Sequence, residues 1–280
     1  MSSYEDLFGG SDDAGLEYFD AEEYELRAQI EQSHYWHVHR RSIILNQLRK
    51  FVEPHSGTRL IEIGCGIGTV ATHLNDHGYC VDYADVHGAA LELAARRARD
   101  VLGERANERR FLRMDISRGL PLKIWSGIML FDVLEHIPDD QGTLEGLHAG
   151  LAPAKDGFVV LTVPAFQFLW SPWDDVEKHK RRYTLESLTN VLRRSGFDIV
   201  QSTYFFGPLF FAALGMKSAR LLKNAITGGQ KAHGIGDLTE SKNIDVLNRL
   251  MLGVLSGERR WLDQSTLPLG TSIFVIARRR

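Results

Sequence analysis

Several classes of protein are excluded by what this 280-residue sequence lacks. It has two cysteines, Cys65 and Cys80, with no Cys-x-x-Cys pair and no charged-then-apolar leader, which disfavours a secreted disulfide scaffold and a structural zinc site. Its most apolar stretch, 204–222, runs for about a dozen residues before Lys217, whereas spanning a bilayer takes roughly 20. With 8 prolines and 44% hydrophobic residues, the composition predicts a folded globular protein, which we expect in the cytoplasm.

Charge is unevenly distributed along the chain. Residues 1–25 contain nine acidic side chains and no lysine or arginine, whereas residues 26–280 have 33 basic and 27 acidic side chains. Residues 1–20 also lack apolar periodicity, which predicts a disordered acidic tail. The basic surplus is dispersed, and nucleic-acid binding needs clustered cations. We therefore expect no nucleic acid as partner. A small anionic ligand would suit this mildly basic charge as well as a nucleic acid would.

Short apolar runs alternate with helical patterns over most of the chain, which predicts a parallel sheet covered by helices. Runs suited to strands lie at 59–63, 79–84, 110–114, 127–131, 157–163, 197–204 and 272–277, and helical spacing appears at 69–76, 89–102, 141–151 and 185–195. Thr184 and Gly196 are suited to cap the last helix. The expected fold is α/β, a Rossmann-like, doubly wound and mostly parallel seven-stranded sheet.

Five segments follow from these patterns. After the tail at 1–20, residues 21–57 form an N-terminal helical cap, 58–204 the core, 205–270 an insertion or lid, and 271–280 the last strand of the core. The insertion is longer than two adjacent antiparallel strands need. Its apolar start predicts either a buried helix covering the sheet, or a wall for a hydrophobic substrate or a membrane-surface contact. Its glycine-containing part, 227–236, predicts a hinge.

The strongest functional signal is a buried strand that runs directly into a glycine cluster at the start of a helix, LIEIGCGIG at 60–68. Because Gly64, Gly66 and Gly68 lack a Cβ, a ligand can approach the backbone N–H groups of this turn. Thr69 stands where the dinucleotide fingerprint Gly-x-Gly-x-x-Gly has its last glycine, which disfavours NAD. Taken alone, the cluster could equally be a structural turn.

Two aspartates at the ends of the next two strands extend this loop into a nucleoside site. Asp85 lies 21 positions after Gly64, where a carboxylate can accept hydrogen bonds from both ribose hydroxyls. Asp115 ends the third strand, in position to accept a hydrogen bond from an adenine amino group while Ile116 lies against the ring. Each aspartate alone is more typical of a cap or turn, but together with the loop they predict a nucleoside ligand.

At these residues the chain resembles the class I S-adenosylmethionine-dependent methyltransferases, of the bacterial methyltransf-11/12 type and similar to ubiquinone-pathway O-methyltransferases. The segment 62–68 resembles the first motif of that family, and DVLEH at 132–136 resembles its segment after the fourth strand. The resemblance covers roughly 59–277, with specific motifs in the first half. It implies S-adenosylmethionine as cofactor, bound by Glu62, Gly64, Cys65, Gly66, Gly68, Asp85, Val86, Asp115, Ile116, Phe131 and Asp132.

The segment after the fourth strand contains candidate metal ligands or a base. Asp132, Glu135 and His136 are spaced i, i+3 and i+4, so one helical turn places them on one face. The pattern is similar to the Glu-x-x-Glu-His segment that holds a divalent ion in ubiquinone-pathway and small-RNA 2′-O-methyltransferases, which implies Mg²⁺, although Asp132 is one methylene shorter. The alternatives are that these side chains order the cofactor and the pocket mouth, or that His136 is a general base.

Two aromatic and basic blocks, 34–41 and 168–183, flank the core and predict surfaces for the acceptor. His179 in the second block is a further candidate base, and helix-end charge or structural filler is the alternative for both blocks. The residues expected to meet the acceptor are Tyr35, Trp36, Trp170, Trp173 and Arg182.

The sequence thus predicts a methyltransferase whose acceptor is small, partly hydrophobic or lipid-linked, with oxygen as the preferred nucleophile. A peripheral membrane contact is compatible with it. The alternative is a non-catalytic protein that binds S-adenosylmethionine or another nucleoside, and an NAD-dependent oxidoreductase is disfavoured by Thr69.

Overall fold

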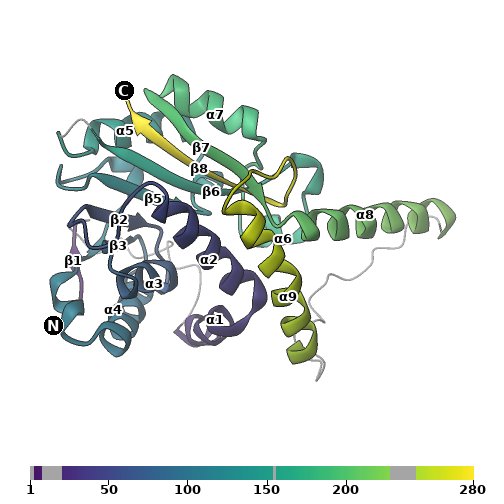
Figure 1. Cartoon of the computed structure of the whole chain (residues 1–280), viewed down its shortest axis with the longest axis horizontal. Helices are drawn as coiled ribbons and strands as arrows, with labels where there is room; N and C mark the ends of the chain where they lie inside the picture. Colours follow the sequence, from purple (N-terminus) through teal and green to yellow (C-terminus); the bar gives the residue numbers. More distant parts are fainter. Residues whose placement is uncertain (1–2, 8–20, 154–155, 228–243) are drawn as a thin grey trace.

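A computed structural model describes residues 3–7, 21–153, 156–227 and 244–280, with helices on both faces of one sheet (Figure 1). The strands are β1 Glu5–Asp6, β2 Arg59–Ile63, β3 Cys80–Asp85, β4 Phe111–Arg113, β5 Gly127–Phe131, β6 Phe158–Pro164, β7 Phe197–Phe205 and β8 Ser272–Arg279. The α-helices are α1 Ala21–Ser33, α2 Tyr35–Arg49, α3 Thr69–Asp76, α4 Gly88–Leu102, α5 Asp140–Gly150, α6 Pro172–Val176, α7 Leu185–Arg194, α8 Gly207–Thr227 and α9 Ile244–Leu262. Short 3₁₀ helices are η1 Gly103–Glu108, η2 Ile116–Arg118, η3 Leu134–His136 and η4 Gln167–Leu169.

The strand order of the sheet is β1-β4-β3-β2-β5-β6-β8-β7. Strand β8 runs antiparallel to β6 and β7, and the other neighbouring strands are parallel. The strand order changes direction between β2 and β5, so the carboxyl ends of these strands border the crevice where doubly wound sheets bind ligands. The predicted Rossmann-like α/β fold is confirmed, and β2, α3 and β5 coincide with the predicted ranges.

Alternating side chains along the strands fill two cores, one on each face of the sheet. Leu60 and Val81 lie in the core under α2, α3, α4 and α9, whereas Ile61 and Ala84 lie in the core under α5 and α7. Both faces are covered, which explains why the predicted strands have almost uninterrupted apolar sequences.

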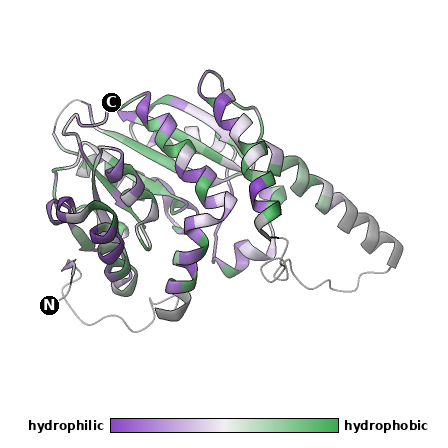
Figure 2. Cartoon of the chain, turned by 60° about the horizontal axis from the view of Figure 1, so that its bottom comes forward, coloured by the Kyte–Doolittle hydropathy of each residue, from purple (hydrophilic) through white to green (hydrophobic). Residues whose placement is uncertain are grey.

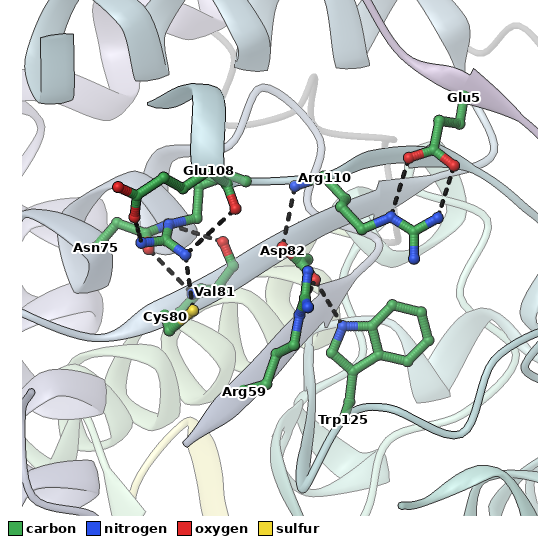
Figure 3. A network of polar contacts seen from close by, with 10 residues as sticks. Glu5, Arg59, Asn75, Cys80, Val81, Asp82, Glu108, Arg110 and Trp125 are labelled. Atoms are coloured by element: carbon green, nitrogen blue, oxygen red, sulfur yellow. Dashed lines mark hydrogen bonds and ion pairs between the residues drawn. The ribbon is translucent and has the colours of Figure 1, made fainter. Parts of the chain in front are cut away.

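The sheet has one strand more than the sequence predicts, because part of the acidic tail is ordered. Glu5 pairs with Leu112 and Asp6 with Arg113 in the parallel β1–β4 ladder. The Arg110 guanidinium also donates two hydrogen bonds to the Glu5 carboxylate (Figure 3). The prediction of disorder is therefore wrong for Glu5–Asp6. Arg113 of β4 and Arg110, which directly precedes β4, form ion pairs with this acidic segment. Residues 8–20 lie outside the described residues.

The predicted insertion contains α8 and α9. Helix α8 extends away from the sheet in Figure 1, and Figure 2 shows the hydrophobic colouring of its first turns. Phe210 is buried, but Phe211, Leu214 and Met216 are 64%, 40% and 58% exposed. The alternative of a buried helix covering the sheet is therefore wrong beyond Phe210, because α8 leaves the body there. Helix α9 packs against α2. The hinge predicted at 227–236 lies outside the described residues, except for Thr227.

Candidate active site

The glycine loop between β2 and α3 has a backbone that favours glycine. Gly64, Gly66 and Gly68 have φ values of 71°, 53° and 72°, in the left-handed region. A Cβ on Gly64 would lie 2.5 Å from Cγ2 of Val133, whereas a Cβ on Gly66 would meet no described atom within 4 Å. Gly66 therefore faces open space at the end of β2, which fits the approach of a ligand to the loop.

Glu62 is a buried carboxylate at the end of β2, directly beneath the loop. Its side chain is 3% exposed, and Oε2 has no hydrogen-bond partner among the described residues. Burial raises the pKa of Glu62 to about 8, against the opposing effects of the Arg40 charge and a hydrogen bond from the Ala71 backbone. A buried carboxylate oxygen without a partner requires an explanation, and a cationic ligand group would supply the missing contacts.

Asp85 at the end of β3 holds the loop from the other side. Its Oδ2 accepts a hydrogen bond from the Gly66 N–H at 2.8 Å, and its Oδ1 accepts one from the His87 N–H at 3.0 Å and lies 2.8 Å from His87 Nδ1. Cys65 is buried in the loop, and burial raises the pKa of its thiol well above the usual value. The predicted Asp85 and glycine loop are thus brought into direct contact.

Asp115 and Ile116 follow β4, on the far side of Asp85 from the loop. Oδ1 of Asp115 accepts a hydrogen bond from the Ser117 N–H at 2.8 Å, which caps η2, and Ile116 is buried. Asp115 also lines an open hollow of about 170 Å³ together with Leu7 of the N-terminal segment. The structure therefore places the two acids at the carboxyl ends of adjacent strands, as the sequence predicts.

Phe131 ends β5 and Asp132 follows it, and helix α2 lies over both. Arg40 of α2 forms an ion pair with Asp132 at 2.6 Å, and its guanidinium lies over the rings of Trp36 and Phe131 at 5.3 and 5.9 Å. Asp132 has a left-handed φ of 58°, a conformation that is strained for most side chains. Arg40 was missed by sequence reasoning, although it belongs to the basic block at 34–41.

Glu135 and His136, which follow β5, lie close to His179, which follows β6. Each offers one potential ligand atom, and these atoms all lie within 4.8 Å of one another. Glu135 is fully buried, and neither carboxylate oxygen has a hydrogen-bond partner among the residues described; His179 Nε2 lies 4.0 Å from its Oε1. Burial and the Asp132 charge raise the pKa of Glu135 well above the usual value, whereas burial and the His179 charge lower the pKa of His136.

Asp174 orients His179 and was not predicted from the sequence. Oδ1 of this buried carboxylate lies 2.8 Å from His179 Nδ1, and both oxygens accept hydrogen bonds from Arg182 at 2.7 and 2.9 Å. Burial by itself would raise the pKa of Asp174, but the hydrogen bonds from His179, Arg182 and the Ser171 backbone outweigh it and lower that pKa. The only signal in the sequence is its place five residues before His179, as part of a capping box with Ser171.

The predicted acceptor residues have different surroundings. Trp36 stacks on Phe206 at 5.5 Å, and the Tyr35 N–H donates to the Asn248 side chain, so α2 is joined to the insertion. The Trp170 indole N–H donates to Asp175, and Trp173 is 53% exposed. The Arg182 guanidinium is bonded to Asp174 and to the Ala165 carbonyl, so its contacts here are internal.

The structure groups the candidate metal ligands differently from the sequence pattern. Asp132 is paired with Arg40 and accepts a hydrogen bond from Thr162, while His179 joins Glu135 and His136 in its place. The set of Asp132, Glu135 and His136 is therefore not the group whose ligand atoms converge, because Arg40 and Thr162 engage the Asp132 carboxylate. In the part of the chain that is described, no helix combines the length and apolar character needed to cross a membrane.

Comparison with models of protein families gives a match to this chain. Residues 35–202, more than half of the chain, match the model of a methyltransferase-domain family. The chain belongs to this methyltransferase family. A search of curated proteins gave no match.

Solved methyltransferase structures share this fold at low sequence identity. Phosphoethanolamine N-methyltransferase 2 of Haemonchus contortus, in complex with S-adenosyl-L-methionine, is 17% identical with a TM-score of 0.52 over 84% of this chain and 52% of that chain. This methyltransferase thus spans about half the length of that protein. The magnesium protoporphyrin IX methyltransferase of Synechocystis with bound S-adenosylhomocysteine (14%, TM-score 0.53, 87% and 85%) and an S-adenosylmethionine-dependent methyltransferase of Mesorhizobium loti (18%, 0.50, 83% and 96%) are also similar.

Proposed function

We propose that this methyltransferase uses S-adenosylmethionine to methylate a hydroxyl group of a small, partly hydrophobic acceptor. The proposal rests on one arrangement: the Glu62 carboxylate with its unpartnered oxygen, the Gly66 backbone and Asp85 lie at the ends of β2 and β3, and His179 lies beside Glu135, which follows β5. Glu62 is placed to meet the ammonium group of the cofactor, and Asp85 the ribose. In this proposal Asp115 and Ile116 meet the adenine. When bound, S-adenosylmethionine supplies a methyl group on a positively charged sulfur.

His179 is the proposed general base for an oxygen acceptor. Asp174 accepts a hydrogen bond from Nδ1–H, which leaves the Nε2 lone pair free to take the hydroxyl proton. With the proton held on His179, the acceptor oxygen would be the nucleophile for the methyl group that S-adenosylmethionine would supply. Glu135, whose pKa burial raises well above the usual value, lies 4.0 Å from Nε2, and in its protonated form it can orient the acceptor oxygen by donating a hydrogen bond.

A divalent metal ion at Glu135, His136 and His179 is the competing explanation of this cluster. Two imidazoles and one carboxylate suit Mn²⁺, Fe²⁺ or Zn²⁺ better than the Mg²⁺ expected from the sequence pattern, because Mg²⁺ prefers oxygen ligands. Calorimetric titration with Mn²⁺, in wild type and in His179→Gln, separates the two. Binding of Mn²⁺ that is lost in His179→Gln favours the metal site and removes His179 as the base.

Exposed apolar side chains near the proposed base support a lipid-linked acceptor. Phe168, Trp173 and Val176 on η4 and α6 are 47%, 53% and 60% exposed, and α6 also carries Asp174. The Lys217 ammonium donates to the Phe168 carbonyl, which joins exposed α8 to the same surface. We infer that this surface contacts a membrane that presents the acceptor.

Cosedimentation with vesicles of anionic phospholipid tests this contact. The variant Phe211→Ser/Met216→Ser is expected to lose vesicle binding, and Val200→Ser, which changes an exposed apolar residue on β7, to keep it. Equal binding by all three proteins contradicts the membrane contact.

The proposed cofactor is tested by titration calorimetry with S-adenosylhomocysteine, in wild type and in Asp85→Ala. Binding by wild type that is lost in the variant supports the site. Methyl transfer from labelled S-adenosylmethionine to hydroxylated acceptors then tests catalysis. The alternative of a non-catalytic nucleoside-binding protein is favoured if the protein binds the cofactor, transfers methyl to no acceptor, and keeps its cofactor affinity in His179→Gln.

A further inference from the structure

The N-terminal segment Tyr4–Leu7 lies along the β4 edge of the sheet, next to the proposed nucleoside site. Glu5 and Asp6 pair in parallel with Leu112 and Arg113, and the Leu7 N–H continues the ladder by donating to the Arg113 carbonyl at 3.0 Å. A two-residue strand buries little area, so its backbone bonds alone hold it weakly. Other contacts must therefore fix this segment to the sheet.

Two ion pairs supply these contacts. Nε and Nη2 of Arg110 donate to the two oxygens of Glu5 at 2.9 and 2.6 Å, the paired geometry visible in Figure 3. Arg113 Nη1 donates to Asp6 Oδ2 at 3.1 Å. Because the Arg113 side chain is only 4% exposed, water screens its ion pair with Asp6 less than it screens a surface pair.

Arg113 also connects this segment to the ribose side of the site. Its Nε donates to the Val86 carbonyl at 3.1 Å, and Val86 directly follows Asp85. The backbone of Met114, which precedes Asp115, donates to the Asp85 carbonyl at 2.9 Å. Asp6, Arg113 and Val86 thus form a continuous polar chain from the N-terminal strand to the residue after Asp85.

We propose that Tyr4–Leu7 is a docking strap that positions the nucleoside-binding turn after β3, with Asp6 and Arg113 as positioning residues and the Glu5–Arg110 pair holding the strap. This inference rests on the proposed function. Undocking the strap breaks the ion pair between Asp6 and buried Arg113, which also bonds the Val86 carbonyl, and removes Leu7 from the wall of the hollow lined by Asp115. The docked strap therefore raises the affinity for the nucleoside part of the cofactor.

A charge exchange in the full-length chain tests this coupling by calorimetry with S-adenosylhomocysteine. Since an exposed ion pair changes an equilibrium by about two- to fivefold, Glu5→Arg should raise the Kd by that factor. Adding Arg110→Glu should restore the wild-type Kd, because the Arg110 guanidinium donates its hydrogen bonds to Glu5 among the residues that the structure describes. Asp198→Arg, which breaks the exposed Arg280 pair beside β7, is the matched control and should leave the Kd unchanged.

Each outcome of this experiment bears on one of the two proposals. Wild-type binding that Glu5→Arg does not weaken overturns the strap while leaving the cofactor site intact. Weakened binding that the double exchange does not restore also overturns it, because the pairing of charges is then not the cause. If wild type itself does not bind S-adenosylhomocysteine, the proposed function fails and the strap with it. Hydrogen exchange of the peptide 3–7 should rise in Glu5→Arg and fall back in the double exchange.

Discussion

Protonation of Glu62 should make cofactor affinity depend steeply on pH. Burial raises the pKa of this carboxyl to about 8, so at pH 7 the free protein holds it mostly protonated. A cofactor ammonium group beside the carboxylate favours the ionised form and lowers that pKa on binding. The free protein must therefore release a proton to bind, and affinity rises with pH until the carboxyl is already ionised.

The size of this effect follows from the fraction of ionised Glu62 in the free protein. With a pKa of about 8, that fraction is about one per cent at pH 6 and about one half at pH 8, so affinity should rise roughly 50-fold over this range. Titration calorimetry with S-adenosylhomocysteine at several pH values measures the slope. Repeating it in buffers of different ionisation enthalpy counts the protons released.

The control is Glu62→Gln, which removes the titrating carboxyl but keeps the size and shape of the side chain. This variant should bind more weakly, and only titration of the ligand amino group should remain in its pH profile. Equal slopes for wild type and Glu62→Gln, or no proton release at pH 7, would refute the placement of the ammonium group at Glu62.

Three further predictions concern the loop, the base and the core. Gly64→Ala should have a lower melting temperature than Gly57→Ala, and a free energy of unfolding lower by about 1–3 kcal/mol. Both glycines have φ near +70°, but only a Cβ at position 64 meets a neighbour, so equal melting temperatures would contradict the contact with Val133. Asp174→Asn should lower kcat about 100-fold or more with little change in S-adenosylhomocysteine affinity, as measured by labelled methyl transfer, and unchanged kcat would remove its orienting role. Trp125→Phe should cost about 1–3 kcal/mol in denaturant unfolding, since its buried indole N–H donates to Asp82 at 2.8 Å (Figure 3), whereas Trp261→Phe at an exposed position should cost much less.

The α/β fold and the glycine loop could be predicted because their signals are local. Each strand and helix is encoded in a short apolar period, and the loop is encoded in glycines whose positive φ values exclude most other residues. The positions of Asp85 and Asp115 were predictable for a related reason: both directly follow predicted strands, and the carboxyl ends of adjacent parallel strands meet at one edge. The surroundings of these acids then follow from the topology.

Contacts between distant segments were decided only by the tertiary structure. Asp174 looks like an ordinary surface charge in the sequence, and only the path of the chain after β6 brings it to His179 and Arg182 and places His179 beside Glu135. Arg40 reaches Asp132 because α2 packs across the end of β5, and no local pattern encodes that packing. Likewise, Glu5 pairs with Arg110 across more than a hundred residues of sequence. Composition predicted disorder for this acidic segment because it does not reveal the basic side chains at the sheet edge that bind it. Apolar composition alone also could not tell whether α8 packs on the sheet or leaves it, because both arrangements use the same residues and differ only in the direction taken after Phe206.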